Sequence, residues 1–268
     1  MLAEMLKAHG VASIEGVTRA LVGRIVNEMA ARRDDPGTIH SRVAAMSSYW
    51  KWLQRRGIAR DDIRNVWHEQ GVAGTAKQDK RPFTDGEMLA LLNGPADPEQ
   101  SDTMRILALS GMRVHELYNL HVRDCAQGWF DIRASKTQAG VRRVPIHSAL
   151  AEIMARRSTA KKPDAFLMHE AGGTSVRRSG AFVKDFGRYR QACNVHEPTQ
   201  GRQSAVTLHT FRAWFASAIR AEHDESVAAT ILGHSKRGVT DRAYTKFSDE
   251  RLKAAVESVR LPAMVART

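Results

Sequence analysis

Apolar residues recur at helical spacing through the first part of the chain. Between residues 17 and 29 they fall on one stripe, and a second stripe runs from Val43 to Leu53. The turn Asp35-Pro36-Gly37 separates the two stripes. We therefore expect two packed helices, with Thr38 as the N-cap of the second and Gly57 just beyond its end.

The composition changes between Gly71 and Pro82, where Gly, Ala, Gln, Lys and Asp replace the apolar periodicity. Such a stretch is typical of a boundary between domains. We expect a helical N-terminal domain over residues 1–76, a linker over 77–83 and a second domain over 84–268.

The pattern in the second domain is mostly helical. Thr84 and Glu87 fit a capping box, and Gly111 follows an apolar helical stripe that it should end. Trp129–Arg133 and Arg142–Ile146 have the pattern of two short strands around a polar turn, which predicts a hairpin. The expected fold class is therefore mostly α with a small antiparallel β-sheet (α+β), in two domains.

Charge narrows the partner classes. Lys and Arg outnumber Asp and Glu by 41 to 29, and the formal charge of +12 favours a polyanion such as DNA or RNA. No apolar run has the length of a bilayer, and Glu4 and Lys7 interrupt the N-terminus too early for a secretion signal. Cys125 and Cys193 have no nearby metal-ligand partners. We expect a cytoplasmic, nucleoid-associated protein with two reduced thiols.

Several polar clusters stand beside apolar helices, and each has an ordinary explanation when taken alone. His209 and Arg212 share a helix face, which suits an anion site but also a structural ion pair. Glu116 stands three residues after Arg113 and could aim it by an ion pair, although such pairs are common on surfaces. Lys136 lies in the hairpin turn, and a lysine there, taken alone, is more often simply solvated.

The last cluster is Leu232-Gly233-His234, and Tyr244 follows it. A helix that ends in Gly delivers His234 to a surface rather than to a core. Tyr244 is one of only four tyrosines in the chain, yet most tyrosines serve in packing. The order of all these clusters is more specific than any one of them.

That order resembles the tyrosine recombinase (phage integrase) family. The resemblance rests on Gly-x-Arg-x-x-Glu-Leu, a hairpin Lys-Thr ahead of Val-Pro, His-x-x-Arg, Leu-Gly-His and then Tyr, from about Pro82 to Phe247. The N-terminal helices resemble, more loosely, the core-binding domain of that family. The matching catalytic positions are Arg113, Lys136, His209, Arg212, His234 and Tyr244.

The resemblance implies a mechanism. Tyr244 would attack a DNA phosphate to give a 3'-phosphotyrosyl intermediate, while Arg113 and Arg212 bind the phosphate oxygens. Lys136 would protonate the leaving oxygen, His209 would act as the base, His234 would hydrogen-bond the phosphate and Glu116 would support the site. We expect no metal ion, because no acidic cluster has a convincing ligand pattern. We also expect no ATP, because the phosphotyrosyl bond retains the energy of the phosphodiester, and no other cofactor.

The resemblance also implies partners. These are double-stranded DNA, a homo-tetramer formed on it, and accessory DNA-bending or directionality proteins, in a phage or another mobile element.

The segment Ser248–Val259 predicts an amphipathic helix that packs either on a neighbouring subunit or on its own chain. Some integrases carry a further N-terminal arm-binding domain, and we expect that it is absent or that this sequence is shortened. Candidate DNA contacts are Arg42, Lys51, Arg142, Arg143, Arg177 and Arg178.

Three other functions fit parts of the sequence. A type IB topoisomerase shares the pocket and the chemistry but relaxes supercoils as a monomer. A catalytically idle DNA-binding protein of the same fold would not need all six polar residues. A basic RNA-binding or ribosomal protein would explain the charge and leave the ordered motifs unexplained.

Overall fold

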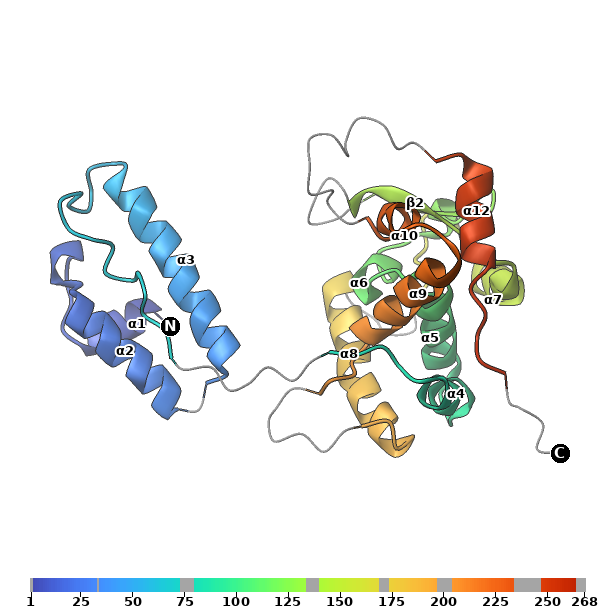
Figure 1. The fold of residues 1–268 in the computed structure, drawn as a ribbon, viewed down its shortest axis with the longest axis horizontal. Coiled ribbons are helices and arrows are strands. Elements are labelled where there is room, and N and C mark those ends of the chain that lie inside the picture. Colours follow the sequence, from blue (N-terminus) through green and yellow to red (C-terminus); the bar gives the residue numbers. More distant parts are fainter. Residues whose placement is uncertain are drawn as a thin grey trace. The chain divides into compact units, whose positions relative to one another are not determined.

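The computed structural model describes residues 2–32, 34–72, 80–133, 140–168, 174–196, 204–233 and 247–263. The chain divides into two compact units, Met1–Gln78 and Asp79–Thr268 (Figure 1). Both units consist mainly of helices, and the second also holds a two-stranded antiparallel sheet. The fold class predicted from the sequence is therefore confirmed. Within the described ranges, no helix combines the length and the apolar character that crossing a membrane requires.

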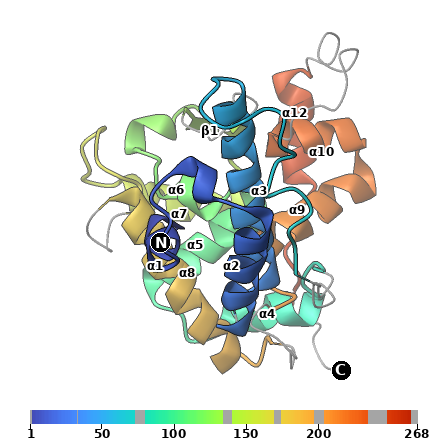
Figure 2. The same ribbon diagram turned by 90° about the vertical axis from the view of Figure 1, so that its left-hand side faces the viewer.

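The N-terminal unit packs two long helices, α2 (Arg19–Ala31) and α3 (Pro36–Gln54), against each other (Figure 1, Figure 2). Thr18 caps α2, because its side chain accepts a hydrogen bond from the Leu21 N–H at 3.2 Å. The two apolar stripes of the sequence are buried between these helices. Two short segments precede α2: α1 (Leu2–Ala8) and η1 (Ile14–Gly16).

Helix α3 begins earlier than the sequence suggested. The prediction that Thr38 is its N-cap is wrong, because the Asp35 side chain accepts a hydrogen bond from the Thr38 N–H at 3.1 Å. Pro36 then occupies the first turn, where its missing N–H costs nothing. The helix ends at Gln54, and Gly57 follows with a φ of 66°.

In the second unit, α5 (Pro98–Ser110) runs through the core and α9 (His209–Glu222) packs along it (Figure 1). The capping box of Thr84 and Glu87 starts α4, as predicted. The remaining helical segments are α4 (Asp85–Asn93), α6 (Val114–Leu117), η2 (Val122–Asp124), η4 (Ser148–Leu150), α7 (Ala151–Ser158), α8 (Ser175–Ala192), α10 (Glu225–Leu232) and α12 (Asp249–Glu257).

The predicted hairpin is present. Strands β1 (Trp129–Ile132) and β2 (Arg142–Pro145) pair in antiparallel register, with Phe130 opposite Val144. Phe130 and Val144 are fully buried. Since successive residues of a strand face opposite sides, Arg142 lies on the same face as Val144 and points toward the core.

Helix α12 lies against β2 and the core of its own unit (Figure 1). Val256 is fully buried. The Glu257 carboxylate accepts hydrogen bonds from the Ser148 N–H at 2.6 Å and from its hydroxyl at 2.7 Å, and His147 Nε2 lies 3.0 Å from the Val259 oxygen. Of the two packing arrangements that the sequence left open, this structure has the one within the chain.

Candidate active site

A glycine turn brings the first arginine into place. Gly111 ends α5 with a φ of 62°, in the left-handed region that favours glycine. A Cβ atom at this position would lie 2.4 Å from Phe215 Cδ1 on α9, so the two helices approach too closely for any side chain. The turn places Arg113 directly before α6.

Glu116 holds Arg113 by two bonds. The Glu116 carboxylate accepts hydrogen bonds from Arg113 Nη1 at 2.8 Å and from the Arg113 backbone N–H at 2.9 Å. This is the ion pair expected from their spacing. About a third of the Arg113 side chain is exposed (34%), whereas the Glu116 side chain is fully buried. The carboxylate therefore fixes an arginine that still reaches the surface.

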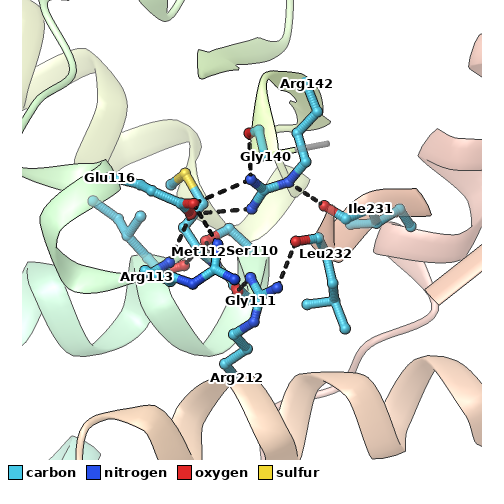
Figure 3. A network of polar contacts seen from close by, with 11 residues as sticks. Ser110, Gly111, Met112, Arg113, Glu116, Gly140, Arg142, Arg212, Ile231 and Leu232 are labelled. Carbon is cyan, nitrogen blue, oxygen red and sulfur yellow. Dashed lines mark hydrogen bonds and ion pairs between the residues drawn. The ribbon is translucent and has the colours of Figure 1, made fainter. Parts of the chain in front are cut away.

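A second arginine binds the same carboxylate. Arg142 Nη1 and Nη2 donate to the two Glu116 oxygens at 3.2 and 3.1 Å (Figure 3). Burial favours the neutral form of Glu116, but the hydrogen bonds and charges of Arg142 and Arg113 outweigh it and lower its pKa to about 2. Glu116 is therefore ionised throughout the physiological pH range.

Arg212 lies beside this cluster and is held by backbone oxygens. Its Nη1 donates to the Gly111 oxygen at 2.8 Å and its Nη2 to the Leu232 oxygen at 2.5 Å (Figure 3). The residue is only 4% exposed. Burial, and then the charges of Arg113 and Arg142, lower its pKa to about 9, so Arg212 is still charged at neutral pH.

His209 begins α9, one turn before Arg212, and is exposed. Partial burial of its ring and the positive charges of Arg212, Lys80 and Arg113 lower its pKa below the usual 6.5. The imidazole is therefore neutral at pH 7 and is able to accept a proton. His209 therefore lies close enough to Arg212 and Arg113 for their charges to disfavour its protonated form.

The structure thus brings together four of the residues that the sequence singled out, namely Arg113, Glu116, His209 and Arg212. Lys136, His234 and Tyr244 lie outside the described residues. The described chain next to two of them belongs to the cluster: the oxygen of Gly140, after Lys136, accepts from Arg142, and the oxygen of Leu232, before His234, accepts from Arg212. Among the described residues, no group of three or more His, Cys, Asp and Glu side chains is arranged to hold a metal ion.

Two of the predicted DNA contacts need correction. Arg142 and Arg178 were expected to track the DNA backbone, but both guanidiniums are buried. The Arg142 side chain is 7% exposed and pairs with Glu116. Arg178 donates to the Tyr118 oxygen at 2.9 Å and lies over the Phe166 ring. Both therefore belong to the interior of the protein.

The other candidate DNA contacts lie closer to solvent. Lys51 and Arg177 are exposed, and about half of the Arg143 side chain is exposed while its guanidinium stacks on Trp129. Arg42 is half-buried and forms an ion pair with Asp34. These four side chains remain candidates for phosphate contacts.

Arg142 belongs to the site, although the sequence places it only among the candidate DNA contacts. Its signal was available in the alternation along β2, because Arg142 stands two residues before the apolar Val144 and therefore on the core-facing side. A charged residue on such a face calls for a buried partner.

The family model and the curated relative that match this chain are both of tyrosine recombinases. A model of the phage integrase family matches residues 86–251, more than half of the chain, and this range holds all six matching catalytic positions. The tyrosine recombinase XerC of Roseiflexus castenholzii (strain DSM 13941 / HLO8) is 26% identical over 262 residues, which cover 92% of this chain and 80% of XerC.

Solved structures share the fold. A lambda integrase(75–356) dimer bound to a COC' core site is 18% identical, with a TM-score of 0.64, over 92% of this chain and 90% of that chain. A lambda integrase tetramer bound to a Holliday junction is 17% identical, with a TM-score of 0.59, over 88% of this chain and 68% of that chain.

Proposed function

Since this chain belongs to the phage integrase family and is a tyrosine-type site-specific DNA recombinase, we propose that it cuts and rejoins DNA through a 3'-phosphotyrosyl intermediate on Tyr244. The observation that carries the proposal is the gathering of Arg113, Arg142 and Arg212 around a single carboxylate, that of Glu116 (Figure 3). One carboxylate does not neutralise three guanidiniums, so the site keeps a positive charge that suits a phosphate.

The excess charge suits the transition state more than the ground state. A phosphodiester carries one negative charge, and attack by an oxygen nucleophile places roughly two on its non-bridging oxygens. Arg113 reaches the surface, and Arg212 lies next to it with donors beyond those that bind Gly111 and Leu232. Hydrogen bonds from these guanidiniums strengthen as the oxygens gain charge.

The proposed step transfers a phosphoryl group between two oxygens. The Tyr244 oxygen bonds to phosphorus while the bond from phosphorus to the 5' oxygen breaks, and Lys136 gives that oxygen a proton. His209, neutral at pH 7, takes the tyrosine proton, and His234 hydrogen-bonds the phosphate. The phosphotyrosyl bond retains the energy of the phosphodiester, so rejoining needs no ATP. The arginines take the part that a metal ion plays in other phosphoryl transferases.

We assign a different role in the reaction with DNA to each unit. We assign DNA binding to residues 1–76 and catalysis to residues 84–268, joined by the linker 77–83. Phosphate contacts fall to the basic side chains on both units that lie near solvent: Arg42, Lys51, Arg143 and Arg177.

Strand exchange between two sites requires several active subunits. Lambda integrase forms a tetramer on a Holliday junction, and we extend that arrangement to a homo-tetramer of this chain. Accessory DNA-bending or directionality proteins would set the direction of the reaction. The protein would act at the nucleoid, and its gene would belong to a phage or another mobile element.

A trapping experiment tests the function. The binding site is selected from a library of random duplexes, and the full chain is then incubated with that site nicked near the cleavage position, so that the small fragment diffuses away. We expect a covalent protein–DNA adduct with wild type and none with Tyr244→Phe. Tyr49→Phe is the matched control, because Tyr49 is an exposed tyrosine of the N-terminal unit.

Each outcome assigns a function. Adduct formation by Tyr244→Phe would identify a different nucleophile. Absence of an adduct with wild type on the selected site would indicate a DNA-binding protein without catalysis. An adduct without exchange of partners between two sites would indicate a topoisomerase.

A further inference from the structure

The Arg142 guanidinium binds three separate segments of the chain. Its Nε donates to the Ile231 oxygen at 2.7 Å and its Nη1 to the Gly140 oxygen at 2.9 Å (Figure 3). Its Nη1 and Nη2 also donate to Glu116 at 3.2 and 3.1 Å. All three nitrogens of one buried side chain are therefore engaged, and together they bind three separate segments of the chain.

Each of these segments leads to a residue with a proposed catalytic role. Glu116 holds Arg113 by the two bonds described above. Gly140 closes the hairpin segment that contains Lys136. Ile231 lies in the last turn of α10, three residues before His234. Arg142 thus binds the residue that holds Arg113 and two chain segments that lead to Lys136 and His234.

The end of α10 is held from two sides. The last carbonyl groups of a helix have no partner inside the helix, and they need donors from elsewhere. Arg142 from β2 binds the Ile231 oxygen, and Arg212 from α9 binds the adjacent Leu232 oxygen. Gly233 then turns the chain with a φ of 67°. The point at which the chain leaves toward His234 is therefore fixed by two guanidiniums.

We propose that Arg142 is a positioning residue for DNA cleavage, which holds the segments carrying Arg113, Lys136 and His234 in one arrangement without touching DNA. This inference rests on the function proposed above. Its basis is burial and geometry: the side chain is 7% exposed, and its donors point to protein oxygens on three segments. A displacement of about 1 Å in a catalytic group is enough to lower a rate by roughly a hundredfold.

The chemistry of arginine suits this task. Its planar guanidinium carries five N–H donors in a fixed fork, whereas lysine offers a compact charge at the end of a flexible stem. Arg142→Lys keeps the charge next to Glu116, so the buried carboxylate retains a partner. It cannot span all three acceptors at once, so the segments lose their common link.

The test compares cleavage with binding in the full chain. The rate of adduct formation on saturating nicked DNA and the Kd for the same duplex are measured for wild type and Arg142→Lys. We expect cleavage to fall by about 10- to 100-fold while the Kd changes less than about twofold. Arg157→Lys is the matched control, because Arg157 is a 5% exposed arginine of the same unit that pairs with Asp102 away from the site.

Three results would overturn the inference. One is a cleavage rate of Arg142→Lys within twofold of wild type. Another is a Kd that rises as much as cleavage falls, since Arg142 would then contact DNA. The third is a loss of cleavage in Arg157→Lys as large as that in Arg142→Lys, with a similar fall in Tm in both variants. The slower cleavage would then reflect general stability. Absence of an adduct with wild type would instead contradict the proposed function.

A second variant covers the case in which Arg142→Lys does not fold. The double variant Arg142→Gln/Glu116→Gln removes both buried charges together, so neither is left without a partner. We expect it to fold, to bind DNA as wild type does, and to cleave at least tenfold more slowly than Glu116→Gln alone, which already lacks the carboxylate that holds Arg113. Cleavage within twofold of Glu116→Gln would contradict the inference.

Discussion

Arg212 donates a hydrogen bond to the backbone oxygen of Gly111, 2.8 Å away, at the point where α5 ends. A buried arginine is more often held by a carboxylate, which offsets its charge. Here backbone oxygens hold the guanidinium, so Arg212 is fixed in place and yet keeps its charge for a phosphate. The geometry of this helix end therefore bears directly on the chemistry of the site.

Gly111→Ala should destabilise the fold. The new Cβ would lie 2.4 Å from Phe215 Cδ1, and the φ of 62° disfavours any residue with a side chain. We expect the free energy of unfolding to fall by about 2–4 kcal/mol in a urea titration. Gly180→Ala, in α8 with no neighbour within 4 Å of a new Cβ, should instead stabilise by about 0.5–1 kcal/mol. Equal effects of the two changes would contradict the role assigned to the turn.

Arg212→Lys should slow cleavage. Lysine keeps the charge but cannot bind Gly111, Leu232 and a phosphate together. We expect the rate of adduct formation to fall by about 10²- to 10³-fold, the usual effect of losing a donor to a transition-state oxyanion. Arg220→Lys is the control, because Arg220 lies on the same helix and forms an exposed ion pair with Glu225. A cleavage rate near wild type for Arg212→Lys would remove Arg212 from the phosphate site.

Glu116 should make stability depend on acid pH. Its pKa in the folded protein is about 2 against an ordinary 4.5, so its contribution is complete above pH 4.5 and is lost as the pH falls toward 2. That shift corresponds to roughly 3 kcal/mol. In urea titrations at several pH values, we expect Glu116→Gln to be less stable than wild type at pH 7 and this difference to shrink below pH 4.5. The exposed Glu152→Gln is the control. A difference that stays constant with pH would show that the Glu116 carboxylate is not held as described.

Arg177→Ala should weaken DNA binding in a salt-dependent way. Arg177 is exposed on α8, and a side chain that neutralises one phosphate contributes about 0.9 to the slope of log K against log salt concentration. We expect the slope measured for Arg177→Ala to be smaller by about that amount. Arg188→Ala is the control, since Arg188 lies on the same helix and pairs with Asp185. Identical slopes for wild type and Arg177→Ala would exclude a phosphate contact.

The sequence predicted those features that depend on neighbours along the chain. The capping box of Thr84 and Glu87, the end of α5 at Gly111 and the ion pair of Arg113 and Glu116 each arise within a few residues. The N-cap of α3 was misplaced for a local reason as well. Thr38 and Asp35 are both acceptable caps, and the structure selects Asp35, which Pro36 follows in the first turn.

Features that depend on distant partners were not predictable in the same way. The alternation along β2 indicates that Arg142 faces the core, but nothing near it in the sequence identifies Glu116, 26 residues earlier, as its buried partner. The backbone acceptors of Arg212 lie 101 and 20 residues away, and backbone oxygens leave no trace in the residue pattern. Only the fold brings these groups together.

The anchoring of α12 has a kinetic consequence. Ser148 and His147 hold the chain beyond Tyr244, and the bonds from Arg212 and Arg142 hold it at the end of α10, so residues 234–246 connect two fixed points of the same unit. Both ends of the stretch that contains Tyr244 therefore belong to the same unit as Arg113 and Arg212, so that one chain supplies both the nucleophile and the arginines. Once DNA is saturated, the rate of adduct formation should therefore be independent of the amount of free protein.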